Sequence, residues 1–416
     1  MGFLQAMPVA TLGVPLTMDR MRKPLLIVGA SARAAAQCAI RAGFDPFCVD
    51  LFADVDTQAC AEVLVASPFP EQIPQLAAQF PTAPFMLTGA MENHIPIVRH
   101  LMKQRTLYGN SIETLTAARD PIRLAQALVD HGLPTPAVYS RADALCGDSL
   151  WLRKPRAGSG GHGIAFFNPH TRNKDVPRNS YYQQYIAGPS LSGVFIAGHD
   201  GVQLLGVSRQ LVGTPWLGAG PFAYAGSIGP MSLDTASQEN WLRIGEVLSQ
   251  AFTLRGLFGV DAIFSQNTIY PVELNPRFTA SVEIFERAFS LKTIRDHVLA
   301  CCGGHLESQT NSRTKDCYGK AVLFARKEIV IPSAMLHLAA ELHADESWPV
   351  LADIPHEGTT IRSGRPILTL MAAGRGESAV IDRLQQLTRR VQRVLRVNAS
   401  TESAARRLDR NSLQAP

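Results

Sequence analysis

The chain contains no Cys-x-x-Cys pair, and its seven cysteines are an odd number in 416 residues. Both facts argue against a disulfide scaffold and against a zinc ribbon. The sequence has no run of eighteen apolar residues, which a membrane-spanning helix would need. Its first seventeen residues also lack the cationic start of a secretion signal. The net charge of +5 is not gathered into a basic run like those of nucleic-acid-binding tails. We therefore expect a cytoplasmic protein whose partners include neither a membrane nor a nucleic acid.

The composition is otherwise that of an ordinary globular protein, with 46% hydrophobic and 18% charged residues. A chain of this length should hold about two to four domains. We expect a mixed α/β and α+β architecture. Its expected divisions are a flexible extension (1–22), a Rossmann-like domain (23–112), a two-lobed α+β domain (113–308), a small β-rich C-terminal α/β subdomain (309–399) and a disordered tail (400–416).

An alternation of apolar runs and helical stretches begins at Lys23. Residues 23–50 are typical of a strand, an Ala-rich helix and a second strand that ends at Asp50. More short strands and helices follow, so we expect a parallel, doubly wound sheet. Ligands of such sheets bind beyond the carboxyl ends of the strands. Glu92, Asn93 and His94 lie at one of these ends and are candidate substrate contacts.

A lysine stands directly before a glycine-rich loop in residues 151–164. Glycines let backbone N–H groups approach an anion, and a lysine adds a point charge, so we interpret this segment as a phosphate-binding loop. It is not a P-loop, because the lysine precedes the glycines. The alternative is a flexible hairpin in which His162 is simply solvated. The candidate anion contacts are Lys154, Gly158, Ser159, Gly160, Gly161 and Gly163.

Two carboxylates and an amide follow the pattern of a metal site in residues 259–277. The segment predicts two strands joined by a turn at Gln266–Thr268, and residues whose numbers sum to 534 then face each other. Asp261 would lie opposite Glu273, and two such carboxylates repel unless a cation lies between them. Oxygen ligands favour Mg²⁺ or Mn²⁺, and Asn275 adds a further oxygen. Arg277 could pair with a phosphate bridged by the metal. The alternative is a purely structural hairpin.

A third segment, residues 181–188, is expected to form a strand that ends in a Gly-Pro turn. The backbone of Gln184, Tyr185 and Ile186 could offer the donor and acceptor pair that an adenine edge requires. A core strand without this role is the alternative.

In this order, the segments resemble the ATP-grasp carboxylate ligases. The resemblance rests on RDPIRLAQALVDHGLPTP, the Lys-Pro and glycine loop, QQYIAG, VDAIF and VELNPR. It implies a Rossmann-like lead domain followed by a two-lobed ATP-grasp domain. It also implies that Lys154 and the loop cover the ATP phosphates, that the 184–186 strand holds adenine, and that Asp261, Glu273 and Asn275 bind magnesium. Arg277 and Lys154 are then the catalytic residues.

The segments RAAAQCAIRAGFDPFCVD, FAYAGSIGP and GRPILTLMAAG resemble most the predicted carboligase branch related to biotin carboxylase. Members of that branch are associated with one-carbon metabolism on tetrahydromethanopterin or methanofuran. Two departures stand out. Pro121 follows Asp120 where the family usually has a lysine, which leaves Arg119 or Arg123 as its substitute, and Gln184 occupies a position that is often Glu.

The resemblance implies an ATP- and Mg²⁺-dependent ligase, which activates a carboxylate as an acyl phosphate for attack by an amine or similar nucleophile. Small-molecule carboxylate and amine substrates are the expected partners, a homodimer is left open, and no general base is assigned. One alternative is a bicarbonate-activating, carboxylase-like enzyme. Another is an NAD(P)-dependent oxidoreductase, argued from Gly29 and from Asp50 about twenty residues later. A nucleotide sensor without turnover is a third.

Overall fold

The computed structural model describes residues 22–145, 149–169, 179–307, 316–343 and 348–412, with the side chains of 397–412 left aside. Residues 1–21, which make up nearly all of the expected N-terminal extension, lie outside the described residues. Among the helices described, none is both long and apolar enough to cross a membrane.

The N-terminal segment forms a four-stranded parallel sheet in the order β3-β2-β1-β4. The apolar strand β1 lies inside this sheet, and its last four residues are fully buried, as expected for a strand covered on both faces. The Rossmann-like expectation is therefore confirmed. Its elements are β1 (Lys23–Val28), α1 (Arg33–Arg41), β2 (Phe44–Asp50), α2 (Val55–Gln58), β3 (Glu62–Val65), α3 (Ile73–Ala77), β4 (Phe85–Leu87) and α4 (Ile95–Met102).

Two short helices lead from this sheet into the first lobe of the next domain. Ser111 caps the first helix by accepting a hydrogen bond from the Thr114 amide, and Asp120 caps the second by accepting one from the Ile122 amide. The lobe itself is a four-stranded sheet in the order β5-β8-β6-β7. The elements are α5 (Ile112–Ala118), α6 (Pro121–Asp130), β5 (Val138–Tyr139), β6 (Trp151–Pro155), β7 (Ala165–Phe167) and β8 (Ser180–Gln184).

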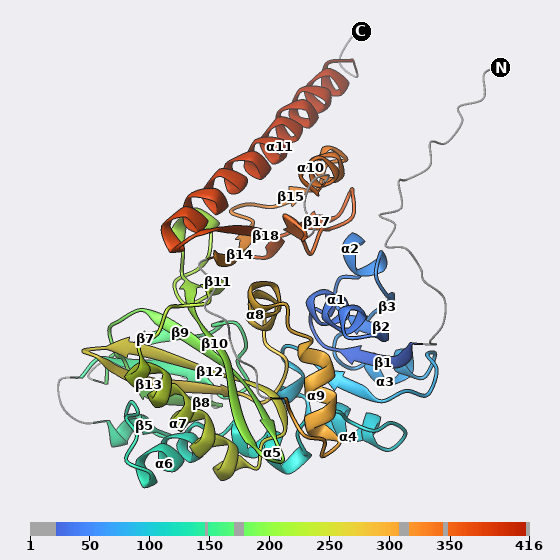
Figure 1. The fold of residues 1–416 in the computed structure, drawn as a ribbon. Coiled ribbons are helices and arrows are strands. Elements are labelled where there is room, and N and C mark those ends of the chain that lie inside the picture. Colours follow the sequence, from blue (N-terminus) through green and yellow to red (C-terminus); the bar gives the residue numbers. More distant parts are fainter. Residues whose placement is uncertain (1–21, 146–148, 170–178, 308–315, 344–347, 413–416) are drawn as a thin grey trace.

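An eight-stranded antiparallel sheet, in the order β13-β12-β9-β10-β11-β14-β18-β16, forms the second lobe and continues into the C-terminal segment (Figure 1). The expected boundary at residue 308 thus does not coincide with a break in the sheet. The strands are β9 (Ser190–Gly198), β10 (Gly201–Val212), β11 (Tyr224–Gly229), β12 (Gly256–Ser265), β13 (Thr268–Asn275), β14 (Asp316–Phe324), β16 (Leu351–Ala352) and β18 (Pro366–Arg375).

The helices of the second lobe and the C-terminal segment extend the sequence analysis and in one place correct it. Residues 282–301 form two helices, α8 (Val282–Phe289) and α9 (Thr293–Cys301), because Ser290 takes a left-handed conformation with φ of 54°. Helix α10 (Ala334–His343) was not predicted from the sequence. Finally, α11 (Glu377–Ser412) continues through most of the expected disordered tail and rises away from the sheets in Figure 1. The remaining elements are α7 (Thr235–Phe252), β15 (Ile329–Val330) and β17 (Thr360–Ile361).

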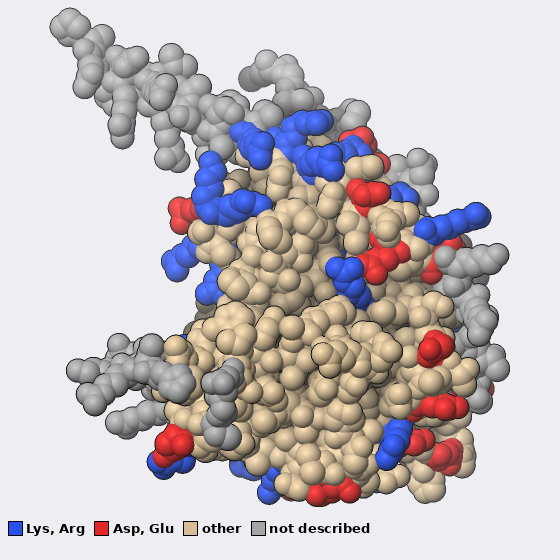
Figure 2. Space-filling view, turned by 90° about the vertical axis from the view of Figure 1, so that its left-hand side faces the viewer, with Lys and Arg blue, Asp and Glu red and all other residues tan. Residues whose placement is uncertain are grey.

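Charged side chains are unevenly spread over the surface. Figure 2 shows Lys and Arg gathered over the upper part of the molecule, where Figure 1 places α10 and α11, and little charge across the middle. Between the two helices, Arg390 of α11 pairs with Glu341 of α10 at 2.9 Å. Because both side chains are largely exposed, this contact contributes little to stability.

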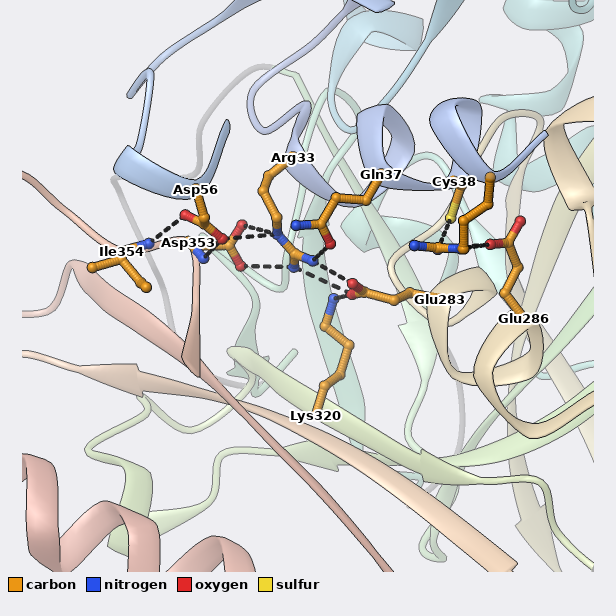
Figure 3. Close-up of polar contacts among 10 residues, drawn as sticks. Arg33, Gln37, Cys38, Asp56, Glu283, Glu286, Lys320, Asp353 and Ile354 are labelled. Carbon is orange, nitrogen blue, oxygen red and sulfur yellow. Dashed lines mark hydrogen bonds and ion pairs between the residues drawn. The ribbon is translucent and has the colours of Figure 1, made fainter. Parts of the chain in front are cut away.

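A buried cluster of charges joins three separate parts of the chain (Figure 3). Arg33 of α1 binds Glu283 of α8 through both of its terminal nitrogens. It also donates to the two carboxylate oxygens of Asp353, at 3.0 and 3.2 Å. Lys320 of β14 donates to Glu283 at 3.0 Å. Although burial alone would raise the pKa of Glu283, Arg33 and Lys320 hold it far below the usual range.

Replacing Arg33 should destabilise the whole fold. Arg33→Met leaves Asp353 without its cation and Glu283 with only Lys320, and loss of one partner from a buried ion pair costs about 3–5 kcal/mol. Urea unfolding followed by circular dichroism measures this loss. Arg141→Met, which removes an exposed pair with Asp143, is the matched control and should leave the unfolding midpoint unchanged. Equal midpoints for Arg33→Met and the wild type would contradict the prediction.

A buried histidine connects the N-terminal sheet with the large sheet. Nδ1 of His297 accepts from the Leu257 amide at 2.9 Å, so the proton lies on Nε2, which donates to the Tyr108 carbonyl at 3.0 Å. Burial lowers the pKa of His297 from 6.5 to about 4. The unfolded chain therefore binds a proton between these values that the folded chain excludes.

Stability should accordingly fall as the pH is lowered from 6.5 toward 4. At about 1.4 kcal/mol per pKa unit, the loss attributable to His297 is about 3 kcal/mol. We expect His297→Gln to be less stable at neutral pH but to lose less on acidification, as measured by urea unfolding at a series of pH values. The exposed His100→Gln variant should follow the wild type. An unchanged acid profile in His297→Gln would refute this assignment.

Candidate active site

A cavity of about 410 Å³ lies where the two lobes meet the N-terminal sheet. Side chains from all three parts line it, including Ser31 and Glu92 from the N-terminal segment, Lys154 from the first lobe and Asp261 from the second. A smaller cavity beside it is lined by Arg119 and the glycine loop. The structure therefore brings together the segments singled out from the sequence, although they are far apart along the chain.

The β12–β13 hairpin places Asp261 directly opposite Glu273, as predicted. The turn is one residue shorter than expected, because Gln266 and Asn267, with φ of 48° and 59°, form a two-residue turn. A bulge between Asp261 and Ala262 compensates for this difference and restores the predicted pairing in the half of the hairpin that faces the cavity.

The two opposed carboxylates differ in their surroundings. Asp261 accepts hydrogen bonds from Gln210 at 2.9 Å and from Asn275 at 3.1 Å. Burial, reinforced by the negative charge of Glu273, raises the pKa of Asp261 to about 6. Glu273 is more exposed and pairs with Arg119 at 2.7 Å. Two hard oxygen ligands with this mutual repulsion fit a divalent cation, which would relieve it.

The structure decides between the two arginines proposed near Pro121. Arg119 points into the site, where it binds Glu273 and donates to the Gly158 carbonyl at 2.9 Å. Arg123 is 68% exposed, and among the described residues its ion pair is with the helix-capping Asp120, at 4.0 Å. Of the two arginines, Arg119 is therefore the one that lies beside Glu273 and the glycine loop.

Arg277 is held by Glu92, a residue expected from the sequence to contact substrate. Glu92, which is 2% exposed, accepts from Arg277 Nε at 2.8 Å. Although burial alone would raise the pKa of Glu92, Arg277 keeps it below its ordinary value. Arg277 also donates to Asn275 Oδ1 at 3.2 Å, so Asn275 links Arg277 to Asp261. Glu92 thus orients Arg277 at the cavity wall.

The two residues after Glu92 take different positions. Asn93 donates to the Gly158 carbonyl at 3.4 Å and so supports the glycine loop. His94 lies at the start of α4, with its ring edge-on to Phe69 at a centroid distance of 6.0 Å, and it is not among the side chains that line the cavity.

The glycine loop lies against the second lobe. The Tyr224 amide donates to the Gly160 carbonyl at 3.1 Å. Gly161 has a φ of 82°, and a Cβ at this position would lie only 1.8 Å from the Phe222 carbonyl oxygen, so this contact requires glycine. His162 is exposed, contacts the Ser159 carbonyl of its own loop and lines the smaller cavity. Gly158, Ser159, Gly160 and Gly161 line both cavities, whereas Gly163 is absent from both linings.

Lys154 on β6 and the residues at the end of β8 line the part of the cavity formed by the first lobe. Lys154 is 8% exposed, and its ammonium donates to Gln183 at 3.1 Å. Burial alone would lower its pKa, but Tyr181 and Glu273 raise it, so the charge is kept. In the candidate adenine segment, the amides of Gln184 and Tyr185 already donate to Ala137 and Leu150. An adenine contact must therefore use the carbonyls of this segment or the amide groups beyond Tyr185.

Asp50, on which the oxidoreductase alternative depends, is not available to a ribose. It is buried and accepts hydrogen bonds from three backbone amides, those of Ala32, Phe52 and Ala53, at 3.3, 3.0 and 2.8 Å. These contacts fix the turn after β2. The site geometry therefore disfavours a nicotinamide dinucleotide at this sheet.

Comparison with known proteins agrees with this geometry. Residues 118–281 match the ATP-grasp domain family. The expected resemblance is confirmed at this level, while the carboligase branch stays a prediction. An uncharacterized protein of Methanocaldococcus jannaschii is 27% identical over 191 residues, which are 46% of this chain and 41% of that protein.

Two solved structures have a similar fold. Pyruvate carboxylase from Rhizobium etli superposes with a TM-score of 0.68 at 11% identity, over 88% of this chain and 37% of that one. L-amino acid ligase from Bacillus licheniformis superposes with a TM-score of 0.66 at 14% identity, over 89% of this chain and 98% of that one. At these identities the likeness concerns the fold.

The repulsion between the two carboxylates can be tested without any ligand. Glu273→Gln removes the opposed charge, so the pKa of Asp261 should fall below about 6 while remaining above 3.8, because burial still raises it. An NMR titration of the Asp carboxyl carbons measures this shift, with Glu62→Gln on the exposed strand β3 as control. A pKa that does not move would show that Glu273 exerts no such influence.

Proposed function

We propose that this protein is an ATP- and Mg²⁺-dependent ligase that activates a carboxylate as an acyl phosphate, which an amine then attacks. The observation that carries the proposal is the cavity in which Lys154, the glycine loop, the Asp261–Glu273 pair and Arg277 meet. A hydride-transfer enzyme does not need the Asp261–Glu273 pair, because it binds no metal-bridged phosphate that must be transferred. An L-amino acid ligase shares the fold, and amino acids carry both a carboxylate and an amine.

The nucleotide would lie between the lobes. Lys154 and the backbone N–H groups of the loop from Gly158 to Gly163 would bind its phosphates, and the segment Gln184–Ile186 would face adenine. Asp261, Glu273 and Asn275 would hold a magnesium ion, which supplies neutralisation of phosphate charge when bound. Arg119, which lines the smaller cavity together with Lys154 and the glycine loop, would add a second cation for the phosphates.

In the proposed chemistry, a carboxylate oxygen attacks the γ-phosphorus and the bond to the bridging oxygen of ADP breaks. The amine nitrogen then attacks the acyl carbon, the carbon–oxygen bond to phosphate breaks, and the nitrogen loses a proton. Arg277 would stabilise the negative charge on the acyl phosphate, and Glu92 would hold its guanidinium in place. In this proposal, Glu92 positions Arg277 and Asn93 supports the glycine loop. Their main role is therefore to position these groups and not to contact the substrate directly.

Bicarbonate activation is the second candidate, because the same cavity would serve it and a pyruvate carboxylase shares the fold. A role in tetrahydromethanopterin or methanofuran metabolism rests on the sequence resemblance alone.

Calorimetric titration tests the proposed function. We expect the wild type to bind ATP in the presence of Mg²⁺ and not to bind NADH or NADPH. Glu273→Gln should weaken the magnesium-dependent part of ATP binding by about tenfold or more, because one charged metal ligand is lost. Glu62→Gln should bind like the wild type. Nicotinamide binding without ATP binding, or full Mg²⁺-dependent affinity in Glu273→Gln, would refute the metal site.

A further inference from the structure

A row of polar side chains crosses the large sheet from the metal carboxylates to the C-terminal segment. Asp261 on β12 faces Ser192 on β9, and Gln210 on β10 donates to Asp261. Gln210 in turn faces Ser227 on β11, and Ser227 faces Lys320 on β14. Residues that face each other on adjacent strands share one side of a sheet. A row of polar side chains therefore runs along one side of the sheet from Asp261 to Lys320.

The far end of this row differs from the nucleotide end. Lys320 is 4% exposed yet lines the cavity, as do Tyr224 and Ser281. The Tyr224 hydroxyl bonds to Ser227 at 2.9 Å, and Ser227 lies 3.4 Å from the Ser281 hydroxyl. An ammonium group and hydroxyl groups thus gather at a place that the nucleotide and metal roles do not use.

The two cations at this end have different donor capacity. Arg33 has five N–H donors, and its contacts to Glu283, Asp353 and Gln37 use all five. Lys320 has three donors, and its contact to Glu283 uses one of them. Arg33 therefore has a supporting role, while Lys320 keeps donors for a ligand in the cavity.

An unpaired hydroxyl points to the same conclusion. Thr279 Oγ1 is buried and lacks a hydrogen-bond partner within the described part of the chain, and Thr279 lines the cavity between Arg277 and Ser281. Buried polar groups in native proteins are normally paired. A polar ligand lying along this wall would supply the missing partner.

We propose that Lys320, assisted by Tyr224 and Ser281, binds a carboxylate at the remote end of an elongated substrate whose other end is activated beside Arg277. The inference rests on the proposed ligase function and adds the substrate class, an elongated molecule with a second acidic group. An ammonium group forms a charge-assisted bond with a carboxylate, which is stronger than a bond to a neutral acceptor.

The sheet sets the length of this substrate. Four strand-to-strand steps separate β12 from β14, and at about 4.8 Å per step the two strands lie roughly 19 Å apart across the sheet. Because this spacing is several times the length of a short diacid, we expect only a longer one to connect the two ends.

Calorimetry with simple dicarboxylates tests the inference. The protein loaded with Mg²⁺ and ADP is titrated with succinate, adipate, suberate and sebacate, and each is compared with the monocarboxylate of the same chain length. We expect the longer dicarboxylates to bind at least tenfold more tightly than their monocarboxylates, and succinate to show no advantage. Lys320→Met should abolish the advantage and leave ADP affinity unchanged, whereas the exposed Lys103→Met should behave like the wild type.

Each outcome is decisive. Wild-type protein that binds Mg²⁺ and ADP but shows no dicarboxylate advantage would overturn the role of Lys320 and leave the proposed function standing. An advantage that persists in Lys320→Met would also overturn it. Failure of the wild type to bind ADP would refute the proposed function itself. Tyr224→Phe, which leaves the Glu283 ion pairs intact, should reduce the advantage and guards against a folding defect in Lys320→Met.

Discussion

The arrangement of the whole molecule depends on the buried guanidinium of Arg33. Its five donors connect α1 of the N-terminal sheet, Glu283 at the start of α8 and Asp353 near β16. Burying charges is costly, and only a fully paired cluster recovers that cost. The three segments must therefore meet in one relative position, and the active-site cavity is the space enclosed between them.

This constraint also explains why the site has rigid walls. Glu92 reaches Arg277 only because the N-terminal sheet is docked against the second lobe, and Asn93 reaches the glycine loop from the same strand end. The loop is in turn held by Arg119 and by the Tyr224 amide. Arg277 and the glycine loop are thus each positioned by residues from another part of the chain.

Local patterns predicted the Rossmann-like sheet, the hairpin that carries Asp261 and Glu273, and the glycine-rich turn after Lys154, because each depends on neighbours in sequence or on a single turn. The pairing of Asp261 with Glu273 was predicted correctly although the turn was assigned one residue too long, since the bulge beside Asp261 compensates. The Arg277–Glu92 pair and the Arg33 cluster join residues 185 to 320 positions apart, and no periodicity signals them. The break between α8 and α9 at Ser290 also has no distinctive sequence pattern, because a left-handed serine is not marked by its neighbours.

The continuity of the large sheet has a consequence for synthesis on the ribosome. Strand β11 ends at Gly229, but its outer neighbour β14 begins only at Asp316. Until that later strand emerges, the nascent chain exposes an unpaired strand edge, which is a site for association with other chains. The C-terminal segment therefore protects the edge of β11 by pairing with it, but only after most of the chain has been synthesised. Lys320 lies on the same strand, so this part of the cavity is completed at the same time.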